Sequence, residues 1–414
     1  MAQGYSSYNI ISSEISYKNS PNIDAFGRLR VSNPFTLFDS SHRFADNGLW
    51  STGTATGGTA TFNAAQGLVD LTVTTASGSE VVRETTKVFS YQPGKSLLVL
   101  STFVMSPAKT NLRQRVGYYG ANNGYYLELN NTTSVSFVER SFVTGAVVNT
   151  PVAQASWNVD PMDGSGPSGI TLDLTKAQIL FMDLEWLGVG TVRIGFVVNG
   201  NFYVCHKFHH ANIIASTYIT TASLPLRYEI TNTGATISAS TLKQICSTVL
   251  SEGGYELNGL QQAIGIPIQS PRTLGTAGTF YPVISLRLKS TRLDGIIILT
   301  ALSIMPMSTA KFNWQVVASG TTTGGTWTDA GVNSSVEYNI TGASFAGGRI
   351  LASGFFSESN QAASQVDILK EALFKFQLER NGLTSTRFEL TLVIASDSSS
   401  DTVVASLDWE EISR

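Results

Sequence analysis

The sequence predicts an all-β protein in which antiparallel sheets pack as two sandwiches. Short runs rich in Val, Thr, Phe, Tyr and Ile recur along the chain, separated by Gly, Asn, Asp and Pro, as in antiparallel strands. The 414 residues exceed one ordinary domain of about 100 to 200 residues, so more than one hydrophobic core is expected. We find neither a repeat of about 20 to 50 residues nor heptads. Solenoids, propellers and coiled-coil stalks are therefore disfavoured.

Residues 1–39 are predicted to form an extended docking arm. The segment is polar and poorly periodic, and it contains a compact apolar and basic run over residues 23–35. A segment of this kind cannot bury enough of itself to offset its own ordering entropy, so we expect order only against another surface. The predicted partner-docking residues are Phe26, Arg28, Leu29, Arg30, Val31 and Phe35.

Residues 40–255 are predicted to form a jelly-roll-like antiparallel β-sandwich. The nearly continuous apolar run at 96–104 predicts a central strand that is buried on both faces. Residues 191–198 and 202–208 predict two strands joined by Asn199-Gly200, because a type I′ hairpin turn needs positive φ at both central residues. A further strand is expected just before them, at 178–186.

One or two short helices and a second sandwich complete the predicted architecture. Residues 240–253 carry Leu242, Ile245, Cys246, Val249 and Leu250 at helical spacing, with Gly253-Gly254 as a stop signal. We place a domain boundary near residue 255 and expect residues 256–414 to form a second antiparallel β-sandwich. Residues 367–380 predict either a second helix or an irregular crossing, since their apolar positions mix both periods.

The composition predicts an oligomer with much uncharged surface. Charged residues make up 14% of the chain, against about 25% in a typical soluble domain. A shortage of surface charge suggests that partner chains cover part of the surface, and a homotrimer is the preferred assembly. The net charge of −3, without runs of either sign, disfavours nucleic-acid binding through a basic face.

The chain shows no signal for a membrane or a secretion pathway. No stretch approaches the ~20 apolar residues that span a bilayer, and the first residues lack the charged and apolar regions of a signal peptide. We therefore expect the protein to stay in the cytosol until it is assembled, without membrane insertion. Cys205 and Cys246 are expected to be two buried free thiols.

Histidines supply the densest cluster of potential metal ligands. His206 and His210 would lie on one face of a strand and His209 on the other. Residues four apart on a strand are separated by ~13 Å, too far to share one ion. Surface or interface histidines are the preferred interpretation, and we predict no metal site.

Two groups of acidic residues allow a functional interpretation, one as a glycosidase pair and the other as a calcium site. Asp183 and Glu185 lie on one strand face at a spacing of ~6.6 Å, which is compatible with the ~5 to 5.5 Å of retaining glycosidases. Asp160, Asp163 and Asp173 flank a Gly-rich stretch that could supply oxygens to Ca²⁺. A solvated or interface face and ordinary turn chemistry are the preferred interpretations.

Other catalytic signatures are missing from the sequence. Pro93-Gly94-Lys95-Ser96 ends like a phosphate-binding loop but lacks its first glycine, and no Gly-x-Ser-x-Gly elbow occurs. We predict no catalytic residue, no cofactor and a non-enzymatic protein. The pairs Tyr118-Tyr119 and Tyr125-Tyr126 place rings on both faces of a hairpin, where a core or interface role is preferred to stacking on sugar rings.

Several segments resemble a family of structural proteins from tailed bacteriophages. The resemblance covers residues 22–256 and rests on AFGRLRVS (25–32), FTLFD (35–39), YQPGKS (91–96), WNVD (157–160), GPSGITLD (166–173), WLGVG (186–190), PLRYEITN (225–232) and SEGGY (251–255). It implies membership of a virion and no catalytic residues. It does not extend beyond residue 256, so the last part of the chain is expected to be variable.

These observations together predict a bacteriophage virion structural protein that docks on other virion proteins through its N-terminal arm. A tail component, such as a fibre, spike or baseplate protein, is the preferred position, and it would present a host-binding surface for a glycan or a protein. A capsid-decoration or head-fibre protein is the alternative. A polysaccharide-cleaving tail enzyme is the third hypothesis.

Overall fold

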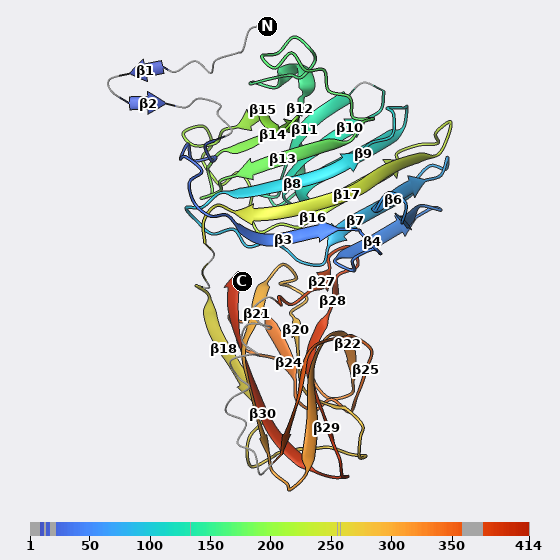
Figure 1. Cartoon of the computed structure of the whole chain (residues 1–414), viewed down its shortest axis with the longest axis vertical. Coiled ribbons are helices and arrows are strands. Elements are labelled where there is room, and N and C mark those ends of the chain that lie inside the picture. Colours follow the sequence, from blue (N-terminus) through green and yellow to red (C-terminus); the bar gives the residue numbers. More distant parts are fainter. Residues whose placement is uncertain are drawn as a thin grey trace. The chain divides into compact units, whose positions relative to one another are not determined.

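The computed structural model shows an all-β protein, which confirms the predicted fold class (Figure 1). It describes residues 9–11, 14–16, 22–132, 134–254, 256, 258–357 and 376–413. The chain divides into two compact units, one of residues 1–85 with 89–255 and the other of residues 86–88 with 256–414.

The first unit is a sandwich of a seven-stranded and an eight-stranded antiparallel sheet. The seven-stranded sheet has the order β12-β11-β10-β9-β16-β7-β4, and the other has the order β15-β14-β13-β8-β17-β6-β5 with β3 paired to β17. The strands are β3 (Phe35–Ser41), β4 (Trp50–Ala55), β5 (Thr59–Asn63), β6 (Leu68–Val73), β7 (Glu80–Thr85), β8 (Leu97–Val104), β9 (Leu112–Tyr119), β10 (Gly124–Asn130), β11 (Ser134–Ser141), β12 (Val148–Ala153), β13 (Gln178–Leu184), β14 (Val192–Val198), β15 (Asn201–Phe208), β16 (Leu226–Asn232) and β17 (Ser240–Ser251). A separate hairpin joins β1 (Asn9–Ile11) to β2 (Glu14–Ser16), and a single 3-10 turn, η1, covers Gln154–Ser156.

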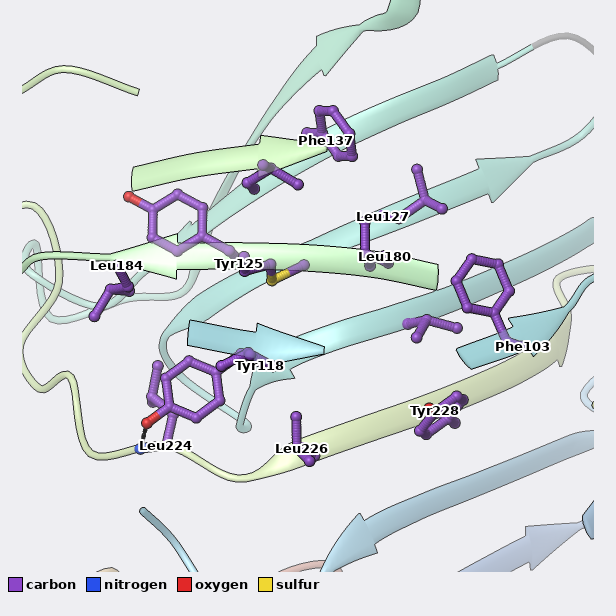
Figure 2. Packing of buried hydrophobic residues seen from close by; sticks show 14 of the residues in the cluster. Phe103, Tyr118, Tyr125, Leu127, Phe137, Leu180, Leu184, Leu224, Leu226 and Tyr228 are labelled. Atoms are coloured by element: carbon purple, nitrogen blue, oxygen red, sulfur yellow. Dashed lines mark hydrogen bonds between the residues drawn. The ribbon is translucent and has the colours of Figure 1, made fainter. Parts of the chain in front are cut away.

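The core of this unit lies between its two sheets. Inward-pointing residues of β8, β9, β10, β11, β13 and β16, and Leu224 just before β16, pack together. Figure 2 shows Phe103, Tyr118, Tyr125, Leu127, Phe137, Leu180, Leu184, Leu224, Leu226 and Tyr228. The phenol of Tyr118 accepts a hydrogen bond from the Leu224 N–H at 3.1 Å and donates one to the Ala222 carbonyl at 2.8 Å. Its polar end is therefore satisfied inside the core.

The second unit contains two larger antiparallel sheets around a separate core, together with the two-stranded pair β27-β28. Strand β30 pairs with β18, β19 and β21, while the larger sheet has the order β23-β24-β20-β29-β22-β25 with β26 on β22. Trp409, Phe312 and Leu392 are among the buried core residues. The strands are β18 (Leu260–Gly265), β19 (Arg272–Thr273), β20 (Tyr281–Leu288), β21 (Ile296–Pro306), β22 (Lys311–Thr323), β23 (Thr328–Asp329), β24 (Val336–Asn339), β25 (Ser344–Ala346), β26 (Arg349–Ser357), β27 (Arg380–Asn381), β28 (Thr386–Arg387), β29 (Glu389–Ser396) and β30 (Thr402–Ser413).

The tight turn at Asn199-Gly200 forms as predicted. Strand β14 ends at Val198 and β15 begins at Asn201, so two residues connect the strands. The φ angles of Asn199 and Gly200 are 50° and 78°, as a type I′ turn requires.

The helix predicted at 240–253 is wrong, because these residues form the long strand β17. Leu242 and Val249 both point into the core although they are seven residues apart, which a regular strand would not allow. A β-bulge between Gln244 and Ser247 shifts the alternation by one residue. The shifted alternation produced the apparent helical spacing.

The second predicted helix falls largely outside the described residues. Its last part, residues 376–380, is extended: Gln377 bridges to Ile298, and Arg380 begins β27. The prediction of two buried thiols holds for Cys205 and is wrong for Cys246, which is exposed on β17. The bulge again explains the difference, since it turns Cys246 away from the core.

Candidate functional site

Residues 22–34 form a loop that packs on the first unit, and we call it the anchored loop. Ile23 and Asp24 are buried, and β3 continues directly from the loop into the eight-stranded sheet. The expectation that residues up to 39 become ordered only against another surface is therefore wrong for residues 22–39. The remainder of the predicted arm, except for β1 and β2, lies outside the described residues.

A buried carboxylate holds the anchored loop. Asp183 on β13 is 0% exposed and accepts hydrogen bonds from Arg30 at 2.8 Å, from Arg193 on β14 at 2.9 Å and from the Ser96 hydroxyl at 3.2 Å. Two guanidinium groups and a hydroxyl thus replace the water that this carboxylate loses on burial. The loop is fixed at this point by an interaction that is costly to break.

Further contacts fix the shape of the loop. Arg30 also forms an ion pair with Glu252, which follows β17. Arg28 donates to Asp24 at 2.8 Å and to the Gly94 carbonyl at 2.9 Å, and its guanidinium lies 4.6 Å from the centre of the Phe26 ring. The predicted docking residues Arg28 and Arg30 therefore bind groups of their own chain.

Three apolar residues of the predicted docking set are exposed at the surface. Leu29 is 51% exposed, Val31 is 86% exposed and Phe35 is 45% exposed. Phe26 is half-buried beside Arg28. The structure thus brings the six predicted residues together, with the arginines as internal anchors and three apolar side chains on the surface.

Two of the sequence segments singled out above, residues 91–96 and 251–255, lie beside this loop. Gly94 and Ser96 of YQPGKS and Glu252 of SEGGY contact Arg28, Asp183 or Arg30. WNVD has a different role: the Asn158 side chain accepts from the Lys207 N–H at 2.9 Å and donates to the Lys207 carbonyl at 2.9 Å. Because β15 is an edge strand, Asn158 occupies backbone groups that would otherwise face a neighbouring chain.

The two acids considered for glycosidase chemistry are not a free pair. Asp183 is saturated by its arginine partners, and Glu185 accepts from the Thr191 N–H at 2.8 Å. Burial raises the pKa of Glu185. Two-carboxylate catalysis requires one carboxyl group as an acid and the other as a nucleophile or base. Because Asp183 is enclosed by arginines, it does not fit either role.

The three histidines have separate surroundings. His206 is buried, and its Nδ1 accepts from the Asn158 N–H at 3.1 Å. His210 lies beyond β15, where Nε2 is 2.8 Å from Glu139 and Nδ1 is 2.6 Å from the Gly190 carbonyl. His209 is near the Thr191 hydroxyl at 3.1 Å. In the described ranges, no three His, Cys, Asp or Glu side chains are grouped as a metal site.

The three aspartates of the Gly-rich stretch cap turns. Asp160 accepts from the N–H groups of Met162 and Ser168, both at 2.8 Å. Asp163 and Asp173 accept from the residue two positions later, Ser165 at 2.9 Å and Thr175 at 3.0 Å. These bonds are the turn chemistry that the sequence favoured.

Sequence reasoning missed a second group of charged and aromatic side chains, on the outward face of the seven-stranded sheet. Along β9, Leu112, Val116 and Tyr118 point into the core, so Arg113 and Arg115 face the other way. We call this face the arginine layer, and its members are Arg113, Arg115, Tyr119, Tyr126, Glu128, Arg140, Arg227 and Glu229.

Glu229 lies at the centre of the arginine layer and is 4% exposed. It accepts from Arg113 at 3.0 Å and from Arg115 at 3.1 Å, and Arg227 lies 3.7 Å away. Burial alone would raise the pKa of Glu229, but the surrounding arginines outweigh it and hold the pKa below its ordinary value. Glu229 is therefore ionised at neutral pH.

Two buried tyrosine rings pack against the arginine side chains of this layer. Tyr119 and Tyr126 are 0% exposed, with ring centroids 4.5 Å apart. The Arg140 guanidinium lies 5.4 Å from the first centroid and 5.3 Å from the second. These rings contact cations and not solvent, while Tyr118 and Tyr125 belong to the core.

Comparison with known proteins identifies similar folds only. No family model and no curated protein matches the chain. Among solved structures, the Emp47p carbohydrate recognition domain is similar over 54% of this chain and 99% of its own (12% identity, TM-score 0.35). The Bacillus licheniformis beta-glucanase matches over 53% and 98% (10% identity, TM-score 0.34), and peanut lectin over 53% and 98% (9% identity, TM-score 0.31). Among the described residues, a helix with the length and apolar character needed to span a bilayer is not found.

Proposed function

We propose that this chain is a structural protein of a bacteriophage particle, placed in the tail as a fibre, spike or baseplate component. In this proposal it docks on other virion proteins through the anchored loop and has no catalytic role. One observation carries the docking role: Leu29 and Val31 are 51% and 86% exposed on a loop whose neighbouring residues are fixed by buried ion pairs.

A rigid loop with exposed apolar side chains favours association for two reasons. Burying Leu29, Val31 and Phe35 against a partner removes apolar surface from water, at about 25 cal/mol per Å². The loop loses little conformational entropy on docking because Arg28 and Arg30 already hold it. The same side chains on a mobile arm would bind more weakly.

The composition supports assembly with several copies. Charged residues make up 14% of the sequence, so a large part of the surface can be desolvated without burying charge. We keep a homotrimer as the proposed oligomer, and sedimentation analysis of the purified chain tests it directly.

Replacement of the exposed apolar residues tests the docking role. The double variant Leu29→Ser, Val31→Ser removes apolar surface and leaves Arg28, Arg30 and Asp24 in place. Ile237→Ser is a matched control, because Ile237 is 94% exposed on another loop of the same unit. We expect the double variant to fold normally and to be lost from particles assembled in its presence, while the control is incorporated. Equal incorporation of both variants would rule out the anchored loop as the docking surface.

A further inference from the structure

We propose that the outward face of the eight-stranded sheet binds the β1–β2 hairpin of the same chain. The proposal goes beyond the docking role of the anchored loop, since it concerns another face and residues that precede the loop. It is tested on the purified protein, so its outcome does not depend on incorporation into particles.

The outward face of this sheet carries apolar side chains, where the solvated face of an antiparallel sheet usually carries polar ones. Leu180 and Met182 point into the core, so Ile179 and Phe181 point to the opposite face of β13. An apolar cluster separate from the main core lies on this side of the sheet. Together with Ile179 we call it the outer apolar face, and its members are Leu98, Leu100, Val159, Phe181, Val197, Phe202, Val204 and Leu250.

The strand register makes the outer apolar face continuous across the sheet. Phe181 on β13 is paired with Leu100 on β8 and with Gly195 on β14. Gly195 is paired in turn with Val204 on β15. A Cβ at Gly195 would lie 2.9 Å from the Phe181 ring, so the glycine leaves room for this ring. The apolar face therefore extends from β8 to β15.

Part of the outer apolar face is in contact with water. Ile179 is 38% exposed, and Leu100, Val197, Phe202 and Leu250 are half-buried. A group of neighbouring apolar side chains that remains accessible on a sheet face indicates a contact site. An occupant of this site should itself be largely uncharged.

The chain before residue 22 starts beside this face. The Ile23 carbonyl accepts a hydrogen bond from Arg193 on β14. Arg193 and Val197 lie on the same face of β14, and four residues along a strand correspond to about 13 Å. Residues 17–22, which connect β2 to Ile23, can span about 20 Å when extended. The hairpin can therefore reach the outer apolar face while the anchored loop stays in place.

The β1–β2 hairpin is too small to be stable by itself. Its strands are joined by three residue pairs, and Ile10 and Ile15 form the middle pair. A two-stranded hairpin without a surface to pack on is marginally stable in water at best. Residues 9–16 contain three isoleucines and one charged residue, Glu14. This composition fits an apolar surface as the support of the hairpin.

The short connection favours the same chain over a second copy. Short linkers keep a tethered segment at an effective concentration on the order of 1 mM near its target. A contact that is too weak to join two separate molecules is therefore sufficient to hold the hairpin on its own sheet.

Thiol labelling at position 179 tests the inference on the full-length chain. Ile179→Cys is combined with Cys246→Ser, so that the introduced thiol is accessible and the other cysteine, Cys205, is buried. The hairpin variant Ile10→Ser, Ile15→Ser is made in the same background and leaves the anchored loop unchanged. We expect position 179 to react about tenfold faster in the hairpin variant, as it would if the native hairpin covered this position in about nine of ten molecules. Equal rates with both hairpins would overturn the inference.

A second labelling position and the protein concentration separate the remaining outcomes. Ile237→Cys replaces a residue that is 94% exposed on another loop, and it should react at the same rate with either hairpin. If its rate also changes, the hairpin substitutions act on the whole unit and the inference is overturned. Protection of position 179 that is independent of protein concentration supports binding within one chain. Protection that increases with concentration would place the hairpin on a second copy and contradict the same-chain assignment.

Discussion

Arg30 and Asp183 lie 153 positions apart in the chain and are joined by a hydrogen-bonded ion pair of 2.8 Å. The pair fastens a loop near the N-terminus to strand β13 inside the eight-stranded sheet. Because Asp183 is fully buried and also pairs with Arg193, the loop is held by the protein's own core. Its exposed apolar residues are therefore presented in a fixed geometry.

Removal of the Asp183 carboxylate should strongly destabilise the first unit. Asp183→Ala leaves Arg193 buried without its anion and releases Arg30, which we expect to cost about 3 to 5 kcal/mol of unfolding free energy. Asp39→Ala, an exposed position on β3, should change it by less than about 0.5 kcal/mol. Urea unfolding of both variants measures the difference. A cost for Asp183→Ala no larger than for Asp39→Ala would mean that the ion pair does not anchor the loop.

The anchor could not be predicted from the sequence, although the strands could. A continuous apolar run and an Asn-Gly turn are local signals, so the sequence predicts the strands within 96–104 and 191–208 correctly. The partners of Arg30 are distant in sequence, and no local pattern connects Arg30 to Asp183. Residues 22–39 bury little of their own surface, so the sequence predicts that they are not ordered by themselves. In the structure they are ordered by contacts with β13 and β17.

The arginine layer was missed for a related reason. Arg113 and Arg115 stand on either side of the polar Gln114 on β9, and a short polar run of this kind is also typical of a solvated strand face. Their convergence with Arg140 and Arg227 depends on the pairing of β9 with β10 and β16, which a single sequence does not specify. The sequence contained one indication of this face: its strands carry several arginine and glutamate residues in a chain that has few charged residues.

Acidification should destabilise the first unit through His206. Burial, with a smaller contribution from His209, lowers the pKa of His206 to about 4, below its ordinary value of 6.5. The folded protein favours the neutral ring, whose Nδ1 accepts from the Asn158 N–H. Stability is therefore complete above about pH 6.5 and falls by roughly 1 to 3 kcal/mol as the pH decreases toward 4.

Unfolding midpoints measured between about pH 7 and pH 4 check this prediction. His206→Asn should reduce the pH dependence of stability in this window. Part of this dependence should remain, because burial also lowers the pKa of His42. An unchanged pH profile in His206→Asn would show that His206 does not titrate on unfolding.

The two thiols should react very differently. Cys246 is exposed on β17, whereas Cys205 is 0% exposed and its pKa is raised by burial. A chromogenic disulfide reagent should label one thiol per native chain and both thiols after denaturation. Rapid labelling of two thiols in the native protein would contradict the packing of β15 in the core.

The Asn158 side chain should protect the edge of the eight-stranded sheet. Asn158→Ala exposes the backbone N–H and carbonyl of Lys207 and should cost about 1 to 2 kcal/mol. We also expect slow association of the variant, seen by light scattering, because an open edge strand pairs with other chains. Asn201→Ala at the start of the same strand is the control, and association equal in both variants would argue against edge protection.

Quantification of this chain in purified phage particles tests the central proposal most directly. Mass spectrometry against the major capsid protein gives its copy number per particle. A tail component predicts that the chain is present as a small fraction of the capsid copies. Absence from particles would contradict a virion role, and a copy number close to that of the capsid protein would contradict placement in the tail.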